Sequence, residues 1–471
     1  GWAALPALQT GVTFRAIGLS YNDAGQVARD ALTNAPNSWN IQAGDTYVPA
    51  TEVSGTISTN TIWTEVGSPY NLTGPVTVDN GVTLTIEPGV DVVFGNNNND
   101  LTVNGTLIAN GSPVDSIYFK NNLASIYLSS SSTGSIIDYA RFDDLGVFNV
   151  AALNVSGDAS ITHSKFSNCE VGVTIMNGAT PTIQFCEMIS SVDYGIRVDD
   201  GSPIIDNSSI DGGTGGIWIQ AGTPSITNST ISNCGSQGGI WINTSDVPTI
   251  DNNTFSSNIY DIRANPMVLD DETFDNNGLS VVHIDNTNVT ANTVWQKPQL
   301  PEVWNYEMLG AVTVDAGVTL SIEPGVEVVF TNGAQDLFVN GTISAIGLET
   351  DSIRFTGGGS TIDVGATGSF SIEYAVFEQM GISNIAALRT AGGGNISNSR
   401  FDQCELGISI TGGASPTIQN CTITNSTDYG IQIVNGSPII SDMLIDDGAF
   451  AGIWIQAGTP SITNSTITNC G

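Results

Sequence analysis

Basic residues are scarce in this chain, and their scarcity excludes a class of function. Lysine and arginine number 11 against 46 aspartates and glutamates, which gives a formal net charge of −35. A protein that binds nucleic acid or an anionic lipid surface needs a cationic patch, and a negatively charged protein is repelled by both partners. We therefore exclude nucleic acid as a partner. The acidity keeps the surface soluble by mutual repulsion, and bridging of molecules by divalent cations stays open.

Other features that the sequence lacks reduce the number of possible folds and functions. No run of 18 apolar residues occurs, so the sequence predicts no membrane span. Charged residues make up only 12% of the chain, whereas Gly, Ser, Thr and Asn are abundant, which is typical of strands and turns. With only His163 and His283 as histidines and no Cys-x-x-Cys pair, a zinc site is not expected. We expect neither a metal nor a cofactor.

What the sequence does contain is repetition on two scales. The stretch from Gly81 to Phe94 returns from Gly317 to Phe330, 236 residues later. Inside each copy an isoleucine recurs, mostly every 22 residues. These isoleucines are Ile137, Ile161, Ile183, Ile205, Ile226 and Ile250, then Ile372, Ile396, Ile418, Ile440 and Ile462. A period of this length predicts a solenoid, because one repeat cannot bury its own apolar face.

Each repeat has the pattern of about three short strands. In residues 202–223, apolar positions alternate in short runs that Gly, Asn and Asp separate, which predicts strands with turns between them. A second apolar position follows each repeating isoleucine by five residues, as at Phe142 and Phe166. We therefore predict an all-β solenoid in which stacked rungs of parallel strands enclose apolar columns.

Two sets of sequence motifs carry a resemblance to a known family over roughly residues 61–471. They are Val-Thr-Leu-Thr-Ile-Glu-Pro-Gly-Val, and Pro-x-Ile-x-Asn-x-x-Ile with Gly-Ile-x-Ile. There the chain resembles the right-handed parallel β-helix proteins of bacterial and archaeal secreted and cell-surface proteins. The resemblance implies a right-handed parallel β-helix and an extracellular, cell-surface location. In character alone, the chain is similar to the sheath proteins of filamentous methanogens.

The repeats also predict the domain boundaries. We expect an N-terminal cap or assembly segment at residues 1–60, a first β-helix copy at 61–292 and a second, incomplete copy at 293–471. Helix formers after a capping residue predict a short helix between Asn22 and Thr33, which we expect to close the open end of the column. The second copy stops at Gly471, so we expect further chain or another molecule to cover its last rung.

Three groups of residues are candidates for covalent modification or contact. The six cysteines occur at matching places in the two copies, and either disulfide bonds, cross-links or buried thiols fit their spacing. They are Cys169, Cys186, Cys234, Cys404, Cys421 and Cys470. The tryptophans Trp218, Trp241 and Trp454 each stand between two inward isoleucines, so they are expected to project outward and to form a protein contact or, less favoured, a sugar contact.

Many asparagines stand in glycosylation sequons, and we divide them by position. Asn207, Asn228, Asn252, Asn420 and Asn464 follow the repeating isoleucine by two residues, where we expect an internal hydrogen-bonded ladder that carries no sugar. Glycans are expected at the sequons outside that position, which are Asn71, Asn104, Asn288 and Asn340.

Known β-helix enzymes provide a test for catalysis. Polygalacturonase-like members carry Gly-His-Gly and Arg-x-Lys motifs, which this sequence lacks. Lyase-like members place a basic residue beside a calcium-binding Asp cluster, and the only lysines here are Lys120, Lys165 and Lys297. The pairs Asp143-Asp144, Asp199-Asp200 and Asp270-Asp271 fall at predicted turns without a cationic companion.

These observations predict a protein that is not an enzyme. The predicted function is that of an extracellular structural protein that assembles with itself into a surface layer, sheath or filament. Cell-envelope glycans are a further expected partner. The alternative is a carbohydrate-binding or polysaccharide-cleaving β-helix protein.

Overall fold

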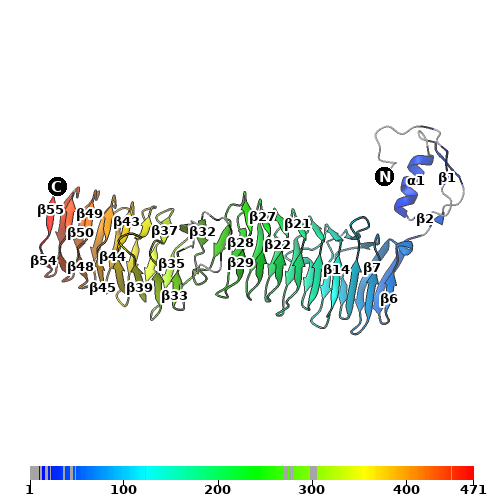
Figure 1. The fold of residues 1–471 in the computed structure, drawn as a ribbon, viewed down its shortest axis with the longest axis horizontal. Coiled ribbons are helices and arrows are strands. Elements are labelled where there is room, and N and C mark those ends of the chain that lie inside the picture. Colours follow the sequence, from blue (N-terminus) through cyan, green and yellow to red (C-terminus); the bar gives the residue numbers. More distant parts are fainter. Residues whose placement is uncertain are drawn as a thin grey trace. The chain divides into compact units, whose positions relative to one another are not determined.

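The structure is a computed structural model of the chain, shown in Figure 1. It describes residues 10, 13–15, 20–21, 23–34, 38–42, 46–47, 49–121, 123–269, 274, 277, 279, 281–297, 305–446 and 448–471. The chain divides into two compact units, Gly1–Trp218 (unit 1) and Ile219–Gly471 (unit 2). Each unit is built from rungs of short parallel strands, so the predicted all-β solenoid is confirmed.

Unit 1 has three parallel sheets, and each sheet receives one strand from each successive rung. The first contains β6 (Thr61–Trp63), β8 (Thr83–Ile86), β11 (Thr106–Asn110), β14 (Ser135–Asp138), β17 (Ala159–Thr162), β20 (Thr182–Gln184) and β23 (Ile204–Asp206). The second contains β9 (Asp91–Phe94), β12 (Ile117–Lys120), β15 (Ala140–Asp143), β18 (Lys165–Ser167), β21 (Glu187–Ile189) and β24 (Ser209–Asp211). The third contains β10 (Leu101–Val103), β13 (Ile126–Leu128), β16 (Ala151–Val155), β19 (Val171–Ile175), β22 (Tyr194–Val198) and β25 (Gly215–Ile219).

Unit 2 repeats this arrangement. Its first-sheet strands are β26 (Ser225–Thr227), β29 (Thr249–Asp251), β33 (Thr293–Trp295), β36 (Thr319–Ile322), β39 (Thr342–Ile346), β42 (Ser369–Glu373), β45 (Gly393–Ser397), β48 (Thr417–Gln419), β51 (Ile439–Ser441) and β54 (Ser461–Thr463). The second-sheet strands are β27 (Thr230–Ser232), β30 (Thr254–Ser256), β34 (Asn305–Met308), β37 (Glu327–Phe330), β40 (Ile353–Thr356), β43 (Ala375–Glu378), β46 (Arg400–Asp402), β49 (Thr422–Thr424), β52 (Leu444–Asp446) and β55 (Thr466–Thr468). The third-sheet strands form two ladders. The first contains β28 (Gly238–Ile242), β31 (Ile262–Ala264) and β32 (Val281–Ile284), and β32 also pairs with β34 of the second sheet. The other contains β35 (Val312–Val314), β38 (Leu337–Val339), β41 (Ile362–Val364), β44 (Ala386–Thr390), β47 (Leu406–Ile410), β50 (Tyr429–Ile433) and β53 (Ala451–Ile455), and β26 and β29 likewise belong to a different sheet from β33 to β54.

The N-terminal part contains the predicted helix. It is α1 (Asp23–Thr33), and the strands around it are β1 (Thr13–Arg15), β2 (Ser20–Tyr21), β3 (Asn40–Gln42) and β4 (Thr46–Tyr47). The helix is confirmed, whereas its capping role stays a prediction. The strands β1 and β3 pair in parallel, as do β2 and β4. The ladders of the β-helix start with β5 (Thr51–Ile57) on β7 (Tyr70–Val78), before the predicted boundary at residue 61, and η2 (Glu65–Gly67) lies between β5 and β7 in the sequence. No helix among the described residues is long and apolar enough to cross a membrane.

The core consists of like side chains stacked on one another. Ile137, Ile161, Ile183 and Ile205 are partners in the register of the first sheet of unit 1, and all four are fully buried. In the second sheet, the rings of Phe119, Phe142 and Phe166 stack with centroids 5.0 and 4.3 Å apart. Unit 2 repeats this stack with Phe355, Phe377 and Phe401, at 5.1 and 4.4 Å.

Many rungs turn from sheet to sheet at a residue with a left-handed backbone. The first corner, between the first and second sheets, has φ between 44° and 56°. It is occupied by Tyr139, His163, Phe185, Asn207, Asn228, Asn252, Tyr374, Asn398, Asn420, Asp442 and Asn464. The second corner, after the second sheet, is occupied by residues that include Asp144, Asn168, Ser190 and Gln403. Asn and Asp adopt this conformation more readily than other side chains, which explains why they dominate the corners.

A small side chain, alanine, serine or cysteine, follows many of the corners, and the cysteines belong to this set. Ser164 Oγ donates to the carbonyl of Thr162, two residues before it, at 2.8 Å, and Cys186 Sγ makes the equivalent contact with Gln184 at 3.3 Å. The other cysteines also follow corners, and all six are free thiols. Of the open alternatives, the structure therefore shows thiols packed at corners and no disulfide among the six.

We expect the phenylalanine stack to carry much of the stability of unit 1. Replacing Phe142 by Ala removes the central ring of a fully buried stack, so it should cost about 3–5 kcal/mol of unfolding free energy. Phe148 is 86% exposed and provides the control, because its replacement by Ala should change little. Chemical denaturation followed by circular dichroism measures both, and equal effects of the two substitutions would refute the stacked core.

The thiols should differ in reactivity. Burial raises the pKa of Cys169, Cys186 and Cys404 to about 12 and that of Cys421 to about 11. At pH 8, well below these values, the reactive thiolate is nearly absent from these four residues. Cys470 is partly exposed. Iodoacetamide at pH 8 should therefore modify Cys470 in the folded protein and all six cysteines after denaturation, as measured by mass spectrometry of peptides. Equal labelling of Cys169 and Cys470 in the folded protein would contradict this.

Candidate functional site

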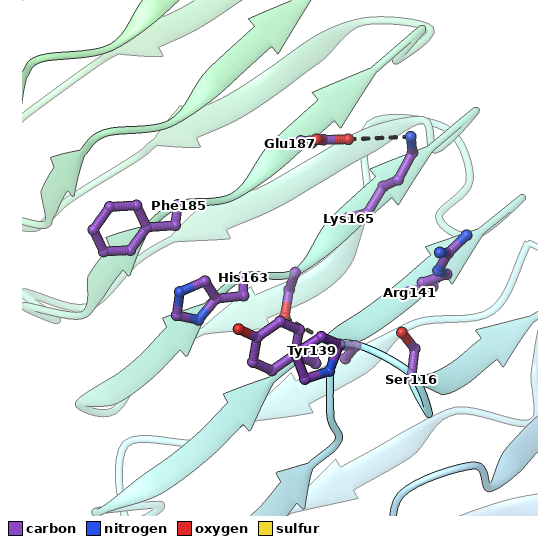
Figure 2. Close-up of a pocket in the computed structure, with 10 residues that line it drawn as sticks. Ser116, Tyr139, Arg141, His163, Lys165, Phe185 and Glu187 are labelled. Atoms are coloured by element: carbon purple, nitrogen blue, oxygen red, sulfur yellow. Dashed lines mark hydrogen bonds and ion pairs between the residues drawn. The ribbon is translucent and has the colours of Figure 1, made fainter.

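A groove on the outer surface of unit 1 gathers most of its unusual side chains. It has a volume of about 240 Å³ and crosses β15, β18 and β21. Its lining residues are Pro113, Ser116, Tyr139, Ala140, Arg141, His163, Ser164, Lys165, Phe185 and Glu187. Figure 2 shows aromatic and imidazole rings along one side of this unit 1 groove and charged side chains along the other.

The ring side is a stack of three side chains on successive rungs. The imidazole of His163 lies between Tyr139, with centroids 4.6 Å apart, and Phe185, at 5.1 Å, and the interplanar angles are 5° and 8°. Because each face of the imidazole is covered by a ring, its plane is fixed and its edge faces outward. Phe185 ends the stack and is 50% exposed.

These three residues occupy first corners, where the backbone favours asparagine. Their φ angles are 47°, 44° and 55° for Tyr139, His163 and Phe185, a region that bulky side chains rarely adopt. Such a conformation costs of order 1 kcal/mol or more for each residue, and it is concentrated in proteins at sites of function. Later rungs of unit 1 and unit 2 place Asn207 and Asn228 at the same corner without that cost.

Asp138 orients the imidazole. Its Oδ1 lies 2.9 Å from His163 Nδ1 and also accepts a hydrogen bond from Thr162 Oγ1 at 2.7 Å. A carboxylate at Nδ1 favours the tautomer in which Nδ1 carries the proton, which leaves the lone pair on Nε2. His163 is exposed, so that nitrogen is accessible to a bound molecule.

The opposite side of the groove carries two cations. Arg141 and Lys165 are register partners on β15 and β18, and Lys165 Nζ forms an ion pair with Glu187 at 3.1 Å. The guanidinium of Arg141 lies 5.3 Å from the centre of the Tyr118 ring, and no described carboxylate pairs with it. The other lysines and arginines described within residues 49–471 all have carboxylate partners. These pairs are Lys120–Asp91, Lys165–Glu187, Arg197–Asp199, Arg263–Asp285, Lys297–Asp351, Arg354–Glu378, Arg389–Asp363 and Arg400–Asp402.

An unpaired guanidinium is able to bind an anion. Planar bidentate donors match a carboxylate, and the neighbouring ammonium adds a second donor. Together with the oriented imidazole, the groove can hold a carboxylate and accept a proton near it. No group of three or more described His, Cys, Asp or Glu side chains is arranged to hold a metal ion.

Sequence reasoning missed this site, although the signal was present. When rungs are aligned on Ile137, Ile161 and Ile183, the residues two places later are Tyr139, His163 and Phe185. The residues four places later are Arg141, Lys165 and Glu187.

The asparagine prediction itself needs a correction. Asn207, Asn228, Asn252, Asn420 and Asn464 are exposed at first corners, not internal. A ladder exists in part on the surface, where Asn252 donates to Asn228 and Asn420 donates to Asn398. The reason is that the left-handed corner directs these side chains outward, while the following residue is buried after Asn207, Asn228, Asn252 and Asn420. Glycosylation at Asn71, Asn104, Asn288 and Asn340 stays a prediction. Asn288 and Asn340 are exposed, and Asn71 and Asn104 are partly exposed.

The tryptophans lie outside the unit 1 groove, and each is partly buried. Trp218 stacks on Tyr194 at 5.2 Å, and Trp454 stacks on Tyr429 at 5.4 Å. Trp241 donates from Nε1 to Asp285 at 2.7 Å beneath the guanidinium of Arg263. Each indole therefore has contacts within its own unit, and the predicted role in protein contact stays a prediction.

Asparagine should replace the groove rings without unfolding the protein. Because asparagine is the residue of many other first corners, His163→Asn and Phe185→Asn should each change the unfolding free energy by no more than about 1 kcal/mol, as lost stacking and relieved backbone strain offset each other. Denaturation midpoints measure this. A loss near that of Phe142→Ala would mean that the rings serve the fold.

Comparison with known proteins identifies the architecture of the chain. The family model described as "Right handed beta helix region" matches residues 91–255, 189–306 and 327–471. These ranges cover most of the chain and confirm the handedness that the resemblance implied. No curated protein sequence matches the chain.

Among solved structures, the chain aligns with the PL6 family alginate lyase AlyGC at 10% identity, over 96% of this chain and 99% of that one, with a TM-score of 0.27. It also aligns with the catalytic domain of a GH87 alpha-1,3-glucanase in complex with nigerose, at 13% identity, over 99% and 69%, with a TM-score of 0.18.

The prediction that the chain is not an enzyme is corrected here: the solved structures that align with it are an alginate lyase and an alpha-1,3-glucanase. The error has a physical reason. The prediction relied on motifs that are contiguous in sequence, whereas a β-helix assembles a surface from one or two residues on each rung. Surface-layer, sheath and filament assembly has no support from these findings.

Proposed function

Because the chain belongs to the right-handed β-helix family, we propose that the unit 1 groove binds an acidic polysaccharide and cleaves it by β-elimination. The observation that carries this proposal is Arg141, the unpaired guanidinium across the groove from an oriented histidine. A uronate unit supplies the carboxylate for Arg141 and Lys165, and its hydroxyl groups fit the polar rim that includes Ser116. Since such polymers occur outside cells, an extracellular or cell-surface location is part of the proposal.

In the proposed reaction Arg141 neutralises the uronate carboxylate, which makes the C–H bond beside it more acidic. Nε2 of His163 accepts that proton, while Asp138 stabilises the imidazolium that forms. The electron pair of the C–H bond forms a C=C bond, and the glycosidic C–O bond on the next carbon breaks. The leaving oxygen takes a proton from the Lys165 ammonium, and solvent returns the proton of His163 to Lys165.

Elimination suits this groove better than hydrolysis. Glycoside hydrolysis normally uses two carboxyl groups, one on each side of the bond. Glu187 is the one carboxylate that lines the groove, and it is engaged by Lys165. An imidazole base and a carboxylate-binding guanidinium are the groups that elimination from a uronate requires.

Activity on polyuronates tests the proposal. The protein should release unsaturated products from at least one of polymannuronate, polyguluronate, polygalacturonate and polyglucuronate, measured by the ultraviolet absorbance of the new double bond. His163→Asn should lower kcat at least about 100-fold, as expected for loss of a general base. Arg141→Ala should lower kcat/KM by a similar factor, because a charge-assisted contact to the substrate is lost.

Arg354→Ala is the matched control, since it removes a partly exposed arginine of unit 2 that pairs with Glu378. Its kcat/KM should equal that of the parent protein. Absence of unsaturated product from all four polymers, or turnover by His163→Asn within threefold of the parent, would overturn the proposed reaction.

A further inference from the structure

Unit 2 contains a second groove at the same place in its own rungs. It has a volume of about 450 Å³ and crosses β43, β46 and β49. Its lining residues are Glu349, Ser352, Tyr374, Ala375, Val376, Asn398, Ser399, Arg400, Asn420 and Thr422. In order along the chain, these ten positions correspond one to one with the ten that line the unit 1 groove. The duplication therefore copied a whole surface site together with the core.

The two grooves share several residues at equivalent positions. Tyr374 stands at the first corner with φ of 47°, as Tyr139 does in unit 1, so the strained tyrosine is present in both copies. Ser399, like Ser164, is buried behind the corner, and its Oγ bonds the carbonyl of Ser397 at 2.7 Å. Arg400 stands where unit 1 has Lys165.

The side chains proposed for catalysis are replaced in unit 2. Asn398 takes the place of His163 and donates from Nδ2 to Oε1 of Glu373 at 2.9 Å, as His163 faces Asp138. Val376 replaces the unpaired Arg141. An amide cannot accept a proton from carbon, and valine cannot hold a carboxylate. This groove therefore lacks both the base and the anion site.

The charges of the unit 2 groove point to a neutral ligand. The lining residues of the unit 1 groove carry Arg141, Lys165 and Glu187, with a formal sum of +1, whereas those of the unit 2 groove carry Arg400 and Glu349, with a sum of zero. Arg400 also lies 3.3 Å from Asp402, which is not a lining residue, so the groove has no cation left to pair with an anionic ligand. The polar surface that is left consists of amides and hydroxyls, chiefly Asn398 and Asn420.

We propose that the unit 2 groove is a second saccharide site, which binds uncharged sugar units and does not cleave them. Tyr374 offers an aromatic ring without a ring partner on the next rung, where Asn398 stands, so sugar C–H groups can contact it. The amides of Asn398 and Asn420 supply donors and acceptors for sugar hydroxyls. This site does not depend on the reaction proposed for unit 1.

Binding of neutral oligosaccharides to the full chain tests this site. Calorimetric titration with hexasaccharides of glucose, mannose and galactose should show at least one ligand that binds with a stoichiometry of one. Tyr374→Asn should weaken its binding at least tenfold, because it removes the ring while retaining a residue that suits the corner. Tyr139→Asn, the same change in unit 1, should leave this affinity unchanged.

The outcome is independent of the elimination assay. Loss of neutral-sugar binding in Tyr374→Asn, with that binding retained in Tyr139→Asn, supports a separate site in unit 2. No binding of any of the three hexasaccharides, or an equal loss in Tyr139→Asn and Tyr374→Asn, would overturn the proposal. Tighter binding of a uronate hexasaccharide than of every neutral one in a protein that carries Arg141→Ala would overturn the preference for uncharged units.

Discussion

Stacking of each rung on an equivalent rung is the interaction on which the rest of this structure depends. Parallel strands lie about 4.8 Å apart, so identical positions in successive repeats come into direct contact. The isoleucine column of the first sheet and the phenylalanine stacks of the second are the apolar result. No single repeat buries enough surface to be stable, which is why the sequence preserves its period so closely.

The same stacking brings outward residues that are one sequence period apart side by side on the surface. A side chain placed outward at one corner faces its counterparts on the rungs before and after it, so a site can be built from one or two residues per rung. Tyr139, His163 and Phe185 form a stack in this way, with Arg141 and Lys165 beside them. The corners tolerate many polar residues, and this tolerance leaves them free to diverge while the inward positions stay apolar.

Divergence after duplication is visible in the two grooves. Both grooves retain a corner tyrosine, a buried serine and a cation at equivalent positions. These residues are Tyr139, Ser164 and Lys165 in unit 1 and Tyr374, Ser399 and Arg400 in unit 2. The grooves differ at the imidazole and the unpaired guanidinium, His163 and Arg141 in unit 1 against Asn398 and Val376 in unit 2. One chain can thus carry two related grooves with different charge, because the outward side chains do not take part in the packing of the core.

The sequence by itself determined the architecture. The spacing of Ile137, Ile161 and Ile183 predicted parallel rungs, and the helix between Asn22 and Thr33 was also predictable, because burial and capping leave periodic or local signals. Only the tertiary structure decided the site. His163 and Arg141 are 22 residues apart in sequence and carry no contiguous motif, and they belong to one groove only once their rungs are stacked. The direction of the corner asparagines was likewise set by the left-handed backbone, which sequence spacing alone does not specify.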